Sequence, residues 1–234
     1  HSSYEPSISA DGRYVAFASE APNLVPNDTN EKVDIFVHDQ ITGSTSRVSV
    51  ASDGTQANDS SARPAISANG RYVAFWSYAS NLVPGDTSSS KWDVFVHDRM
   101  AGTTIRVSVA NNGESGNGAS AYPSISANGR YVAFYSSANN LVPNDTNQRT
   151  DIFIHDLITG TTSRVSVDSN GAQANGQSLY PSISADGRYV AFSSSASNLV
   201  LNDTNGKPDI FVHDLVGGAT TRVSVTSDGS QANG

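Results

Sequence analysis

The sequence predicts an all-β fold, a β-propeller of four similar four-stranded antiparallel blades. The first observation is an internal repeat, because a segment of about 58 residues occurs four times in the 234-residue chain. The second is that each copy holds short apolar runs separated by turn residues, which is typical of strands. The third is that no stretch has the apolar period of a helix, so we expect almost no helix. The copies fill residues 1–234, which we expect to form a single propeller domain.

Two sequence markers define the repeat. One is Ile-Ser-Ala-Asp-Gly-Arg-Tyr-Val-Ala-Phe, with Asn for Asp in some copies, and it begins at Ile8, Ile66, Ile125 and Ile183. The other is a later His, spaced by 59, 58 and 58 residues, at His38, His97, His155 and His213. The markers place the repeats at approximately residues 1–58, 59–117, 118–175 and 176–234. The final residues also match the phase of the first ones, so a further blade would continue the pattern.

Each copy contains four candidate strands, which in the first copy we expect over residues 6–10, 13–19, 34–39 and 45–50. Asp11-Gly12 joins the first two strands, and Gly there supplies the positive φ that a tight hairpin needs. A second turn ending in Gly43 joins the last two. The four strands should therefore form an antiparallel meander.

The packing of these sheets follows from the apolar runs at residues 14–17 and 35–37. They do not alternate with polar residues, which indicates sheets covered on both faces. A single four-stranded blade cannot cover itself, whereas blades packed radially cover each other. A β-helix would need a much shorter period. Three arrangements stay open: one chain closes alone, two chains share an eight-bladed ring, or the four blades are part of a larger propeller.

The repeat also resembles that of a known family. Pro-Ser-Ile-Ser-Ala-Asp-Gly-Arg-Tyr-Val-Ala-Phe, followed by Asp-Ile-Phe-Val-His-Asp, is similar to the blade of TolB-like propellers, in which Pro-x-x-Ser-x-Asp-Gly precedes Ile-Ala-Phe and Asp-Ile-Tyr-x-x-Asp. The resemblance covers all four copies. They depart from it in being longer and in ending the third strand with His-Asp. It implies the propeller fold, and its repeats occur both in binding proteins and beside hydrolase domains.

Composition excludes several classes of function. The chain has no Cys, which excludes disulfides, thiolate metal sites and a cysteine nucleophile. Its 22 acidic and 14 basic residues give a net charge of -8, so we expect no nucleic acid partner. No apolar run approaches the length of a membrane span, so we expect no membrane insertion.

The loop after the second strand is a candidate calcium site. Asp28, Asn30 and Asp34 place oxygen side chains at alternating positions, and calcium prefers six to eight oxygen ligands. The other copies supply Asp145, Asn147, Asp151, Asp203, Asn205, Asp209, Asp86 and Asp93, with Ser88 replacing Asn in the second copy. The alternative is that these side chains form Asx-turns and cap the third strand.

Two further sets of repeated residues are interpreted as structural. We expect the four repeated His side chains to form hydrogen bonds between neighbouring blades. Eight of the eleven Arg occupy the positions of Arg13 and Arg47 in the four copies, and we expect them to pair with the repeated Asp side chains.

A ligand site should break the repeat, because a site needs different residues in different roles. The clearest breaks are in the second copy, at Arg63, Trp76, Tyr78 and Trp92, with another at Tyr135. We therefore predict ligand binding by Arg63, Trp76, Tyr78 and Trp92, whose aromatic rings could stack on sugars. We identify no catalytic residues, because no nucleophile, base or carboxylate pair stands out among so many Ser and Asp residues.

These observations favour an extracellular or cell-envelope (periplasmic), bacterial binding and interaction module whose ligand is a glycan or a protein. Repeated loops suit multivalent attachment. One alternative is a glycan-cleaving or other hydrolase-associated propeller domain. Another is a structural, self-assembling repeat protein that forms a homo-oligomer.

Overall fold

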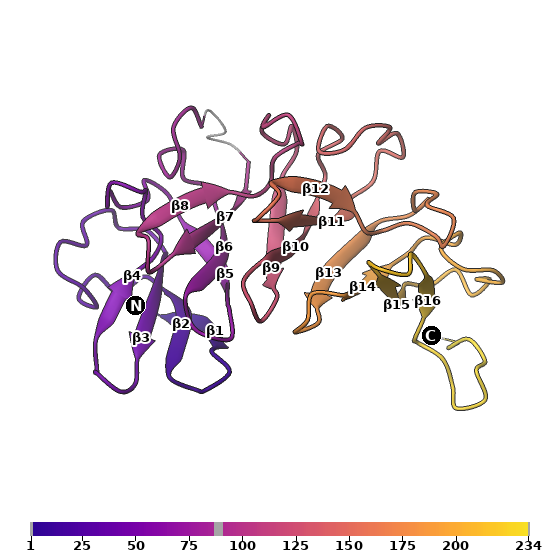
Figure 1. Cartoon of the computed structure of the whole chain (residues 1–234), viewed down its shortest axis with the longest axis horizontal. Coiled ribbons are helices and arrows are strands. Elements are labelled where there is room, and N and C mark those ends of the chain that lie inside the picture. Colours follow the sequence, from indigo (N-terminus) through magenta and orange to yellow (C-terminus); the bar gives the residue numbers. More distant parts are fainter. Residues whose placement is uncertain (1, 87–90, 234) are drawn as a thin grey trace.

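The computed structural model describes residues 2–86 and 91–233, in which sixteen strands form four four-stranded sheets (Figure 1). The first sheet contains β1 (Ser3–Ile8), β2 (Tyr14–Ser19), β3 (Asp34–Asp39) and β4 (Thr45–Arg47). The second contains β5 (Ser61–Ile66), β6 (Tyr72–Ser77), β7 (Asp93–Asp98) and β8 (Thr103–Arg106). The third contains β9 (Ser120–Ile125), β10 (Tyr131–Ser136), β11 (Asp151–Asp156) and β12 (Thr161–Arg164). The fourth contains β13 (Ser178–Ile183), β14 (Tyr189–Ser194), β15 (Asp209–Asp214) and β16 (Thr220–Arg222).

Every sheet is an antiparallel meander in chain order, as predicted. The described residues contain no helix, and hence none that could cross a membrane. The predicted third strand, residues 34–39, matches β3. The first strand begins at Ser3 rather than at residue 6, because Ser3 pairs with Ser19 on the far side of a bulge. The fourth ends at Arg47 rather than at residue 50, because beyond it the Ser49 hydroxyl, not a backbone carbonyl, accepts the N–H of Ile35.

The four sheets, which we call blades 1 to 4, follow one another along an open arc (Figure 1). β1, β5, β9 and β13 line its inner side, and β4, β8, β12 and β16 lie on its outer side. Blades 1 and 4 lie at opposite ends of the arc. The chain therefore has the predicted propeller blades but does not close them into a ring by itself.

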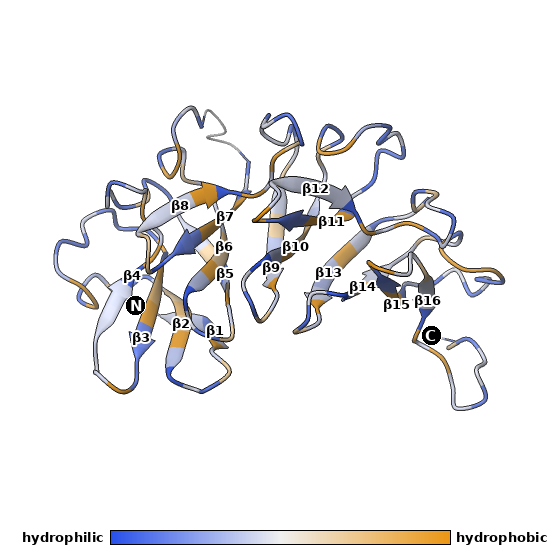
Figure 2. Cartoon of the chain, viewed as in Figure 1, coloured by the Kyte–Doolittle hydropathy of each residue, from blue (hydrophilic) through white to orange (hydrophobic). Residues whose placement is uncertain are grey.

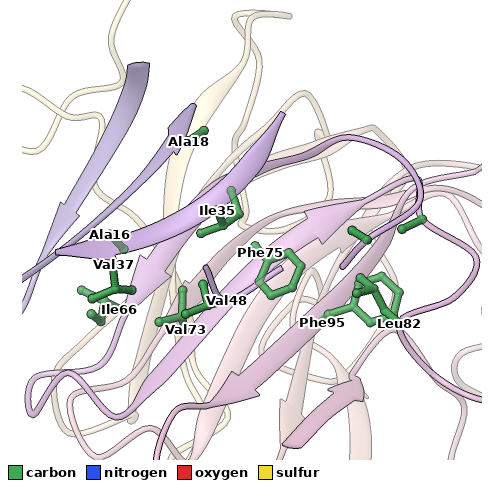
Figure 3. Close-up of a cluster of buried hydrophobic side chains, with 12 residues drawn as sticks. Ala16, Ala18, Ile35, Val37, Val48, Ile66, Val73, Phe75, Leu82 and Phe95 are labelled. Carbon is green, nitrogen blue, oxygen red and sulfur yellow. The ribbon is translucent and has the colours of Figure 1, made fainter. Parts of the chain in front are cut away.

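Apolar side chains fill the space between consecutive blades in three clusters. Hydrophobic colour marks segments of the strands, among them β3, β8 and β13, and the loops carry both hydrophobic and hydrophilic colours (Figure 2). Figure 3 shows the cluster between blades 1 and 2, where Ile35 and Val48 of blade 1 meet Ile66 and Phe75 of blade 2. Blades 2 and 3, which have a neighbour on each side, are thus covered on both faces. This explains the nearly continuous apolar runs of their strands.

At each interface a glycine of one blade lets a tyrosine ring of the preceding blade approach its backbone closely. A Cβ at Gly70 would lie 2.1 Å from Cδ2 of Tyr14 in the preceding blade, so only Gly admits the ring. The same arrangement recurs for Gly129 with Tyr72 and for Gly187 with Tyr131. The glycines predicted for the first hairpin turn therefore also form part of the packing surface between blades, at Gly70, Gly129 and Gly187.

Candidate functional site: the axial groove

A backbone irregularity recurs in the middle of each inner strand. The strands β1, β5, β9 and β13 each contain one proline, which we call the strand proline. The residue before it has a positive φ, at Glu5 (56°), Arg63 (55°), Tyr122 (55°) and Tyr180 (56°). It lies where the pairing with the next strand shifts register, which identifies a β-bulge. Non-glycine residues rarely adopt this conformation, and such strain concentrates at functional sites.

The bulges bring these four side chains together on the inner side of the arc. Arg63 Nε lies 2.7 Å from Glu5 Oε1, and the Arg63 backbone N–H donates to Glu5 Oε2 at 2.7 Å. Arg63 Nη2 donates to the Tyr122 hydroxyl at 3.1 Å, with the guanidinium carbon 4.4 Å from the ring centroid. Tyr122 meets Tyr180 edge to face, with centroids 5.2 Å apart. An acid, a base and two phenols thus form one continuous chain of contacts.

Tyr135, on the neighbouring strand β10, packs against this series of contacts. Its ring stacks on Tyr122 with centroids 5.3 Å apart. Burial, with smaller contributions from Tyr122 and Tyr180, raises the pKa of Tyr135 to about 12. The Tyr135 phenol therefore stays neutral at physiological pH and can donate a hydrogen bond.

The four residues line a groove of about 240 Å³, together with the prolines Pro6, Pro64, Pro123 and Pro181. Each proline fixes the backbone beside the bulge. The Tyr180 side chain remains 58% exposed in the groove. We call this site the axial groove; it combines exposed aromatic surface with a positioned carboxylate and guanidinium.

The predicted aromatic residues form a separate cluster. Trp76 stacks on Trp92 with centroids 5.1 Å apart, and Tyr78 meets them edge-on at 5.7 and 5.6 Å. They lie where β6 ends and β7 begins, beside residues 87–90, which lie outside the described chain. The buried Trp76 Nε1 has no hydrogen-bond partner among the described residues. Arg63, predicted with these three, instead contacts Glu5 and Tyr122 in the axial groove.

The predicted calcium loops hold their carboxylates against a guanidinium. In each copy one Arg Nη1 lies 2.9 to 3.7 Å from two of the predicted Asp side chains. The sets are Arg47 with Asp28 and Asp34, Arg106 with Asp86 and Asp93, Arg164 with Asp145 and Asp151, and Arg222 with Asp203 and Asp209. Burial raises the pKa of Asp34, Asp145 and Asp151. The guanidinium therefore offsets the charge of two buried carboxylates.

The Asn of each loop adds hydrogen bonds. Asn30 Nδ2 donates to Asp34 at 2.9 Å, and Asn30 Oδ1 accepts the backbone N–H of Lys32, which makes an Asx-turn. Asn147 and Asn205 make the same two contacts. Ser88 lies outside the described residues. Among the residues that the structure describes, no three acidic or His side chains converge as metal ligands.

The other repeated residues are structural, as expected. Arg13 pairs with Asp39 of its own blade at 2.7 Å, and Asp39 also accepts the N–H of Ile41 in the turn. His38 Nδ1 lies 2.9 Å from Thr45 Oγ1 of the same blade, so the expected hydrogen bond between blades is wrong for the His itself. The threonine equivalent to Thr45 reaches the neighbouring blade instead; Thr162, for example, donates to the Val109 carbonyl at 2.6 Å.

Sequence reasoning missed Glu5, Tyr122 and Tyr180, although a signal was present. The residue before the strand proline is Glu, Arg, Tyr or Tyr, whereas the segment of twelve residues that begins at that proline is nearly identical in the four copies. A search for the copy that departs most from the repeat finds only Arg63 among the four residues before the strand prolines. Comparing the four copies position by position would have added Glu5, Tyr122 and Tyr180 to the candidates, because their position holds an acid, a base and two phenols.

Comparison with known proteins supports the fold. No family model matches the sequence, and no curated protein matches it. TolB from Acinetobacter baumannii is similar in structure at 17% identity and a TM-score of 0.57, over 98% of this chain and 45% of that one. A putative TolB from Agrobacterium tumefaciens is similar at 17% identity and a TM-score of 0.58, over 97% and 63%.

The propeller domain of the Trilobed protease from Pyrococcus furiosus is also similar, at 13% identity and a TM-score of 0.56, over 95% of this chain and 56% of that one. The chain thus spans 45–63% of the length of these proteins. At such identities the likeness concerns the fold alone. Together with four antiparallel four-stranded blades around a common inner side, it shows that this chain has a TolB-like β-propeller fold.

Proposed function

We propose that the chain is an extracellular or cell-envelope binding module whose axial groove holds a carbohydrate. One observation carries the proposal: four equivalent positions hold an acid, a base and two phenols directly before a segment of twelve residues that is nearly identical in the four copies. Packing alone would accept the same residue in all four blades. All four residues also have a positive φ, which costs conformational free energy in a residue other than glycine. Such strained residues concentrate at binding and catalytic sites, which supports a binding role.

The chemistry of the groove favours a sugar. The exposed ring of Tyr180 offers an apolar face for the C–H side of a sugar ring. Glu5 and Arg63 hold each other in a fixed orientation, and Arg63 keeps N–H donors beyond those used by Glu5 and Tyr122. Such paired groups suit hydroxyl or carboxylate groups on a ring. A groove of about 240 Å³ accommodates a sugar-sized group rather than a folded protein.

The test is titration calorimetry with cello-, xylo-, chito- and galacturono-oligosaccharides. We expect at least one of these probes to bind, and Tyr180→Ala to weaken it at least ~10-fold because the stacking ring is removed. Trp92→Ala is the matched aromatic control outside the axial groove, and it should leave the affinity unchanged.

Each other outcome has a definite meaning. Loss of binding in Trp92→Ala but not in Tyr180→Ala would move the site to the Trp76, Tyr78 and Trp92 cluster predicted from sequence. Cleavage of a probe, seen by product chromatography, would support the glycan-cleaving alternative. Failure of all probes to bind would contradict a carbohydrate ligand and favour a protein ligand. Fractionation of the source cells tests the proposed location.

Calcium binding by the predicted calcium loops, which we also call the acidic loops, remains a separate prediction. The ion would have to compete with a guanidinium that already lies between two carboxylates, as Arg164 does between Asp145 and Asp151. A site with a dissociation constant on the order of 0.1 mM would stabilise the fold by roughly 1.4 kcal/mol in about 1 mM calcium. Thermal melts in calcium and in excess chelator test this. A calcium-dependent rise that Asp145→Ala reduces would support the prediction, and identical melts would contradict it.

A further inference from the structure

The two ends of the arc expose faces that are buried between blades everywhere else. Each internal interface joins two faces: the trailing face of one blade, which in blade 1 carries Ile35 and Val48, and the leading face of the next, which in blade 2 carries Ile66 and Phe75. Three such interfaces occur. The trailing face of blade 4 and the leading face of blade 1 remain without a partner in the described chain (Figure 1).

The trailing face of blade 4 is apolar and open. Ile210 and Val223 occupy the positions of Ile35 and Val48, and they are 42% and 48% exposed. Their equivalents in the other blades are at most 1% exposed; these are Ile35, Val94, Ile152, Val48, Val107 and Val165. Blade 4 thus presents the same apolar surface as the other blades, without a cover.

The leading face of blade 1 shows the complementary half. Ile8 is 59% exposed, whereas Ile66 at the same position in blade 2 is 7% exposed. Leu24 is partly exposed, whereas its equivalents Leu82, Leu141 and Leu199 are each 1% exposed. The trailing face of blade 4 and the leading face of blade 1 are therefore the two halves of an interface of the kind that joins the other blades.

The shapes of the two faces also match. A tyrosine ring of one blade fits against a glycine of the next at all three internal interfaces. Blade 4 ends the series with an exposed Tyr189, and blade 1 begins it with Gly12, where a Cβ would meet no atom within 4 Å. Tyr189 and Gly12 are thus the missing halves of a fourth pair.

Backbone hydrogen bonds repeat the pattern along the inner side of the arc. Ala10 N–H donates to the Ala68 carbonyl at 2.9 Å, Ala68 to Ala127 at 3.0 Å, and Ala127 to Ala185 at 3.0 Å. The next bond of this series would run from Ala185 N–H to the carbonyl of an Ala10. A partner with the leading face of blade 1 would complete it.

We propose that a second copy of this chain docks head to tail, so that two arcs close one ring of eight blades. The occupant follows from continuity with the three internal interfaces, since the partner of each open face is the face at the other end of the same chain. Each copy would use both faces once, and the two contacts would be related by a twofold axis. The proposal does not depend on the ligand of the axial groove.

Sedimentation velocity and light scattering of the 234-residue chain over a wide range of concentration test it. We expect a species of twice the 24.5 kDa chain mass that dissociates only on dilution. Mass that remains at one chain at every concentration would overturn the proposal. Mass that grows without limit would also overturn it, because it would mean that the arcs form filaments instead of a ring.

Two variants locate the interface. Gly12→Asn places a side chain where Tyr189 of the second copy would lie, and Ile210→Glu places a charge on the opposite face. Each should weaken association at least ~30-fold, the size of a hot-spot effect, while circular dichroism stays unchanged. Because they lie on different faces, Ile210→Glu decides the matter if Gly12→Asn fails to fold.

Gly43→Asn is the matched control. Gly43 has a φ of +71°, close to the +73° of Gly12, and a Cβ at its equivalents Gly102 and Gly160 would meet no atom within 4 Å. This variant should associate like the original chain. Equal loss of association in Gly43→Asn would overturn the assignment of these two faces.

Discussion

At the scale of single residues, the chain places its charged groups in two different settings. Arg164 is largely buried between Asp145 and Asp151, which are 2% and 0% exposed. Arg130 pairs with Asp156 at 2.7 Å, but more than a third of its side chain is exposed. Burial makes the difference, because removing one partner of a buried ion group leaves an uncompensated charge out of water.

Arg164→Leu should therefore lower the free energy of unfolding by about 3–5 kcal/mol. Arg130→Leu, in the same blade, should lower it by much less, since water screens the exposed pair. Urea unfolding of both variants makes the comparison. Equal losses would show that burial does not govern these contacts.

The histidines make stability depend on pH. Burial lowers the pKa of His97, His155 and His213 from the ordinary value of 6.5. The unfolded chain then binds protons near pH 6.5 before the folded chain does. The stability that these residues confer is complete above that pH, and it is lost as the pH falls through their folded pKa values.

His155→Asn should thus reduce the loss of stability between about pH 7 and pH 5. The Asn amide can still donate to Thr162, the partner of His155 Nδ1. His38→Asn, at the partly exposed equivalent position, is the control. Urea midpoints across this pH range give the result, and an unaltered pH dependence in His155→Asn would exclude a contribution from this imidazole.

At the scale of the elements, the turn between the first two strands of blades 2, 3 and 4 takes part in blade packing, whereas the turn between the last two strands does not. Gly70 and Gly43 both have a φ of +71°, but only Gly70 faces the ring of Tyr14. Gly70→Asn should cost about 1–3 kcal/mol more than Gly43→Asn, because the ring must move to admit a side chain. Asn tolerates positive φ, so the backbone cost is similar in both. Similar melting temperatures for the two variants would contradict a role of Gly70 in packing.

The strands could be predicted where local chemistry decides them. The third strand of the first copy, residues 34–39, is bounded by polar loops and matches β3. The start of β1 could not be predicted, since Ser3 enters the sheet only because the bulge at Glu5 lets the chain resume pairing. The end of β4 depends on the Ser49 hydroxyl, a contact that no periodicity reveals.

The site could be predicted less well than the strands. Arg63 stands out in the sequence, but its partners Glu5 and Tyr122 lie 58 and 59 residues away, so only the fold brings them together. Trp76, Tyr78 and Trp92 do meet, because they lie at facing ends of neighbouring strands. The acidic loops stand out in the sequence as a set, and the pairing of the repeated Arg with the repeated Asp side chains is predicted there as well. The position of one guanidinium between two carboxylates of the same loop could not be predicted, because only the fold brings the three side chains together.

At the scale of the whole molecule, the arc behaves as a short one-dimensional array. Each internal core joins consecutive blades, so blades 2 and 3 are supported on two faces and blades 1 and 4 on one. In such arrays stability depends on the number of neighbours, and the end units open first. Closure of a ring would remove this difference, because every blade would then have two neighbours.

Hydrogen exchange can show this directly. In the single-chain state of Gly12→Asn, amides of β1–β4 and β13–β16 should exchange faster than those of β5–β12. In the original chain at high concentration all four blades should exchange at similar rates, since the open faces of blades 1 and 4 are covered. Gly43→Asn should match the original chain. Faster exchange of blades 1 and 4 in the concentrated original chain would mean that its end faces remain exposed to water.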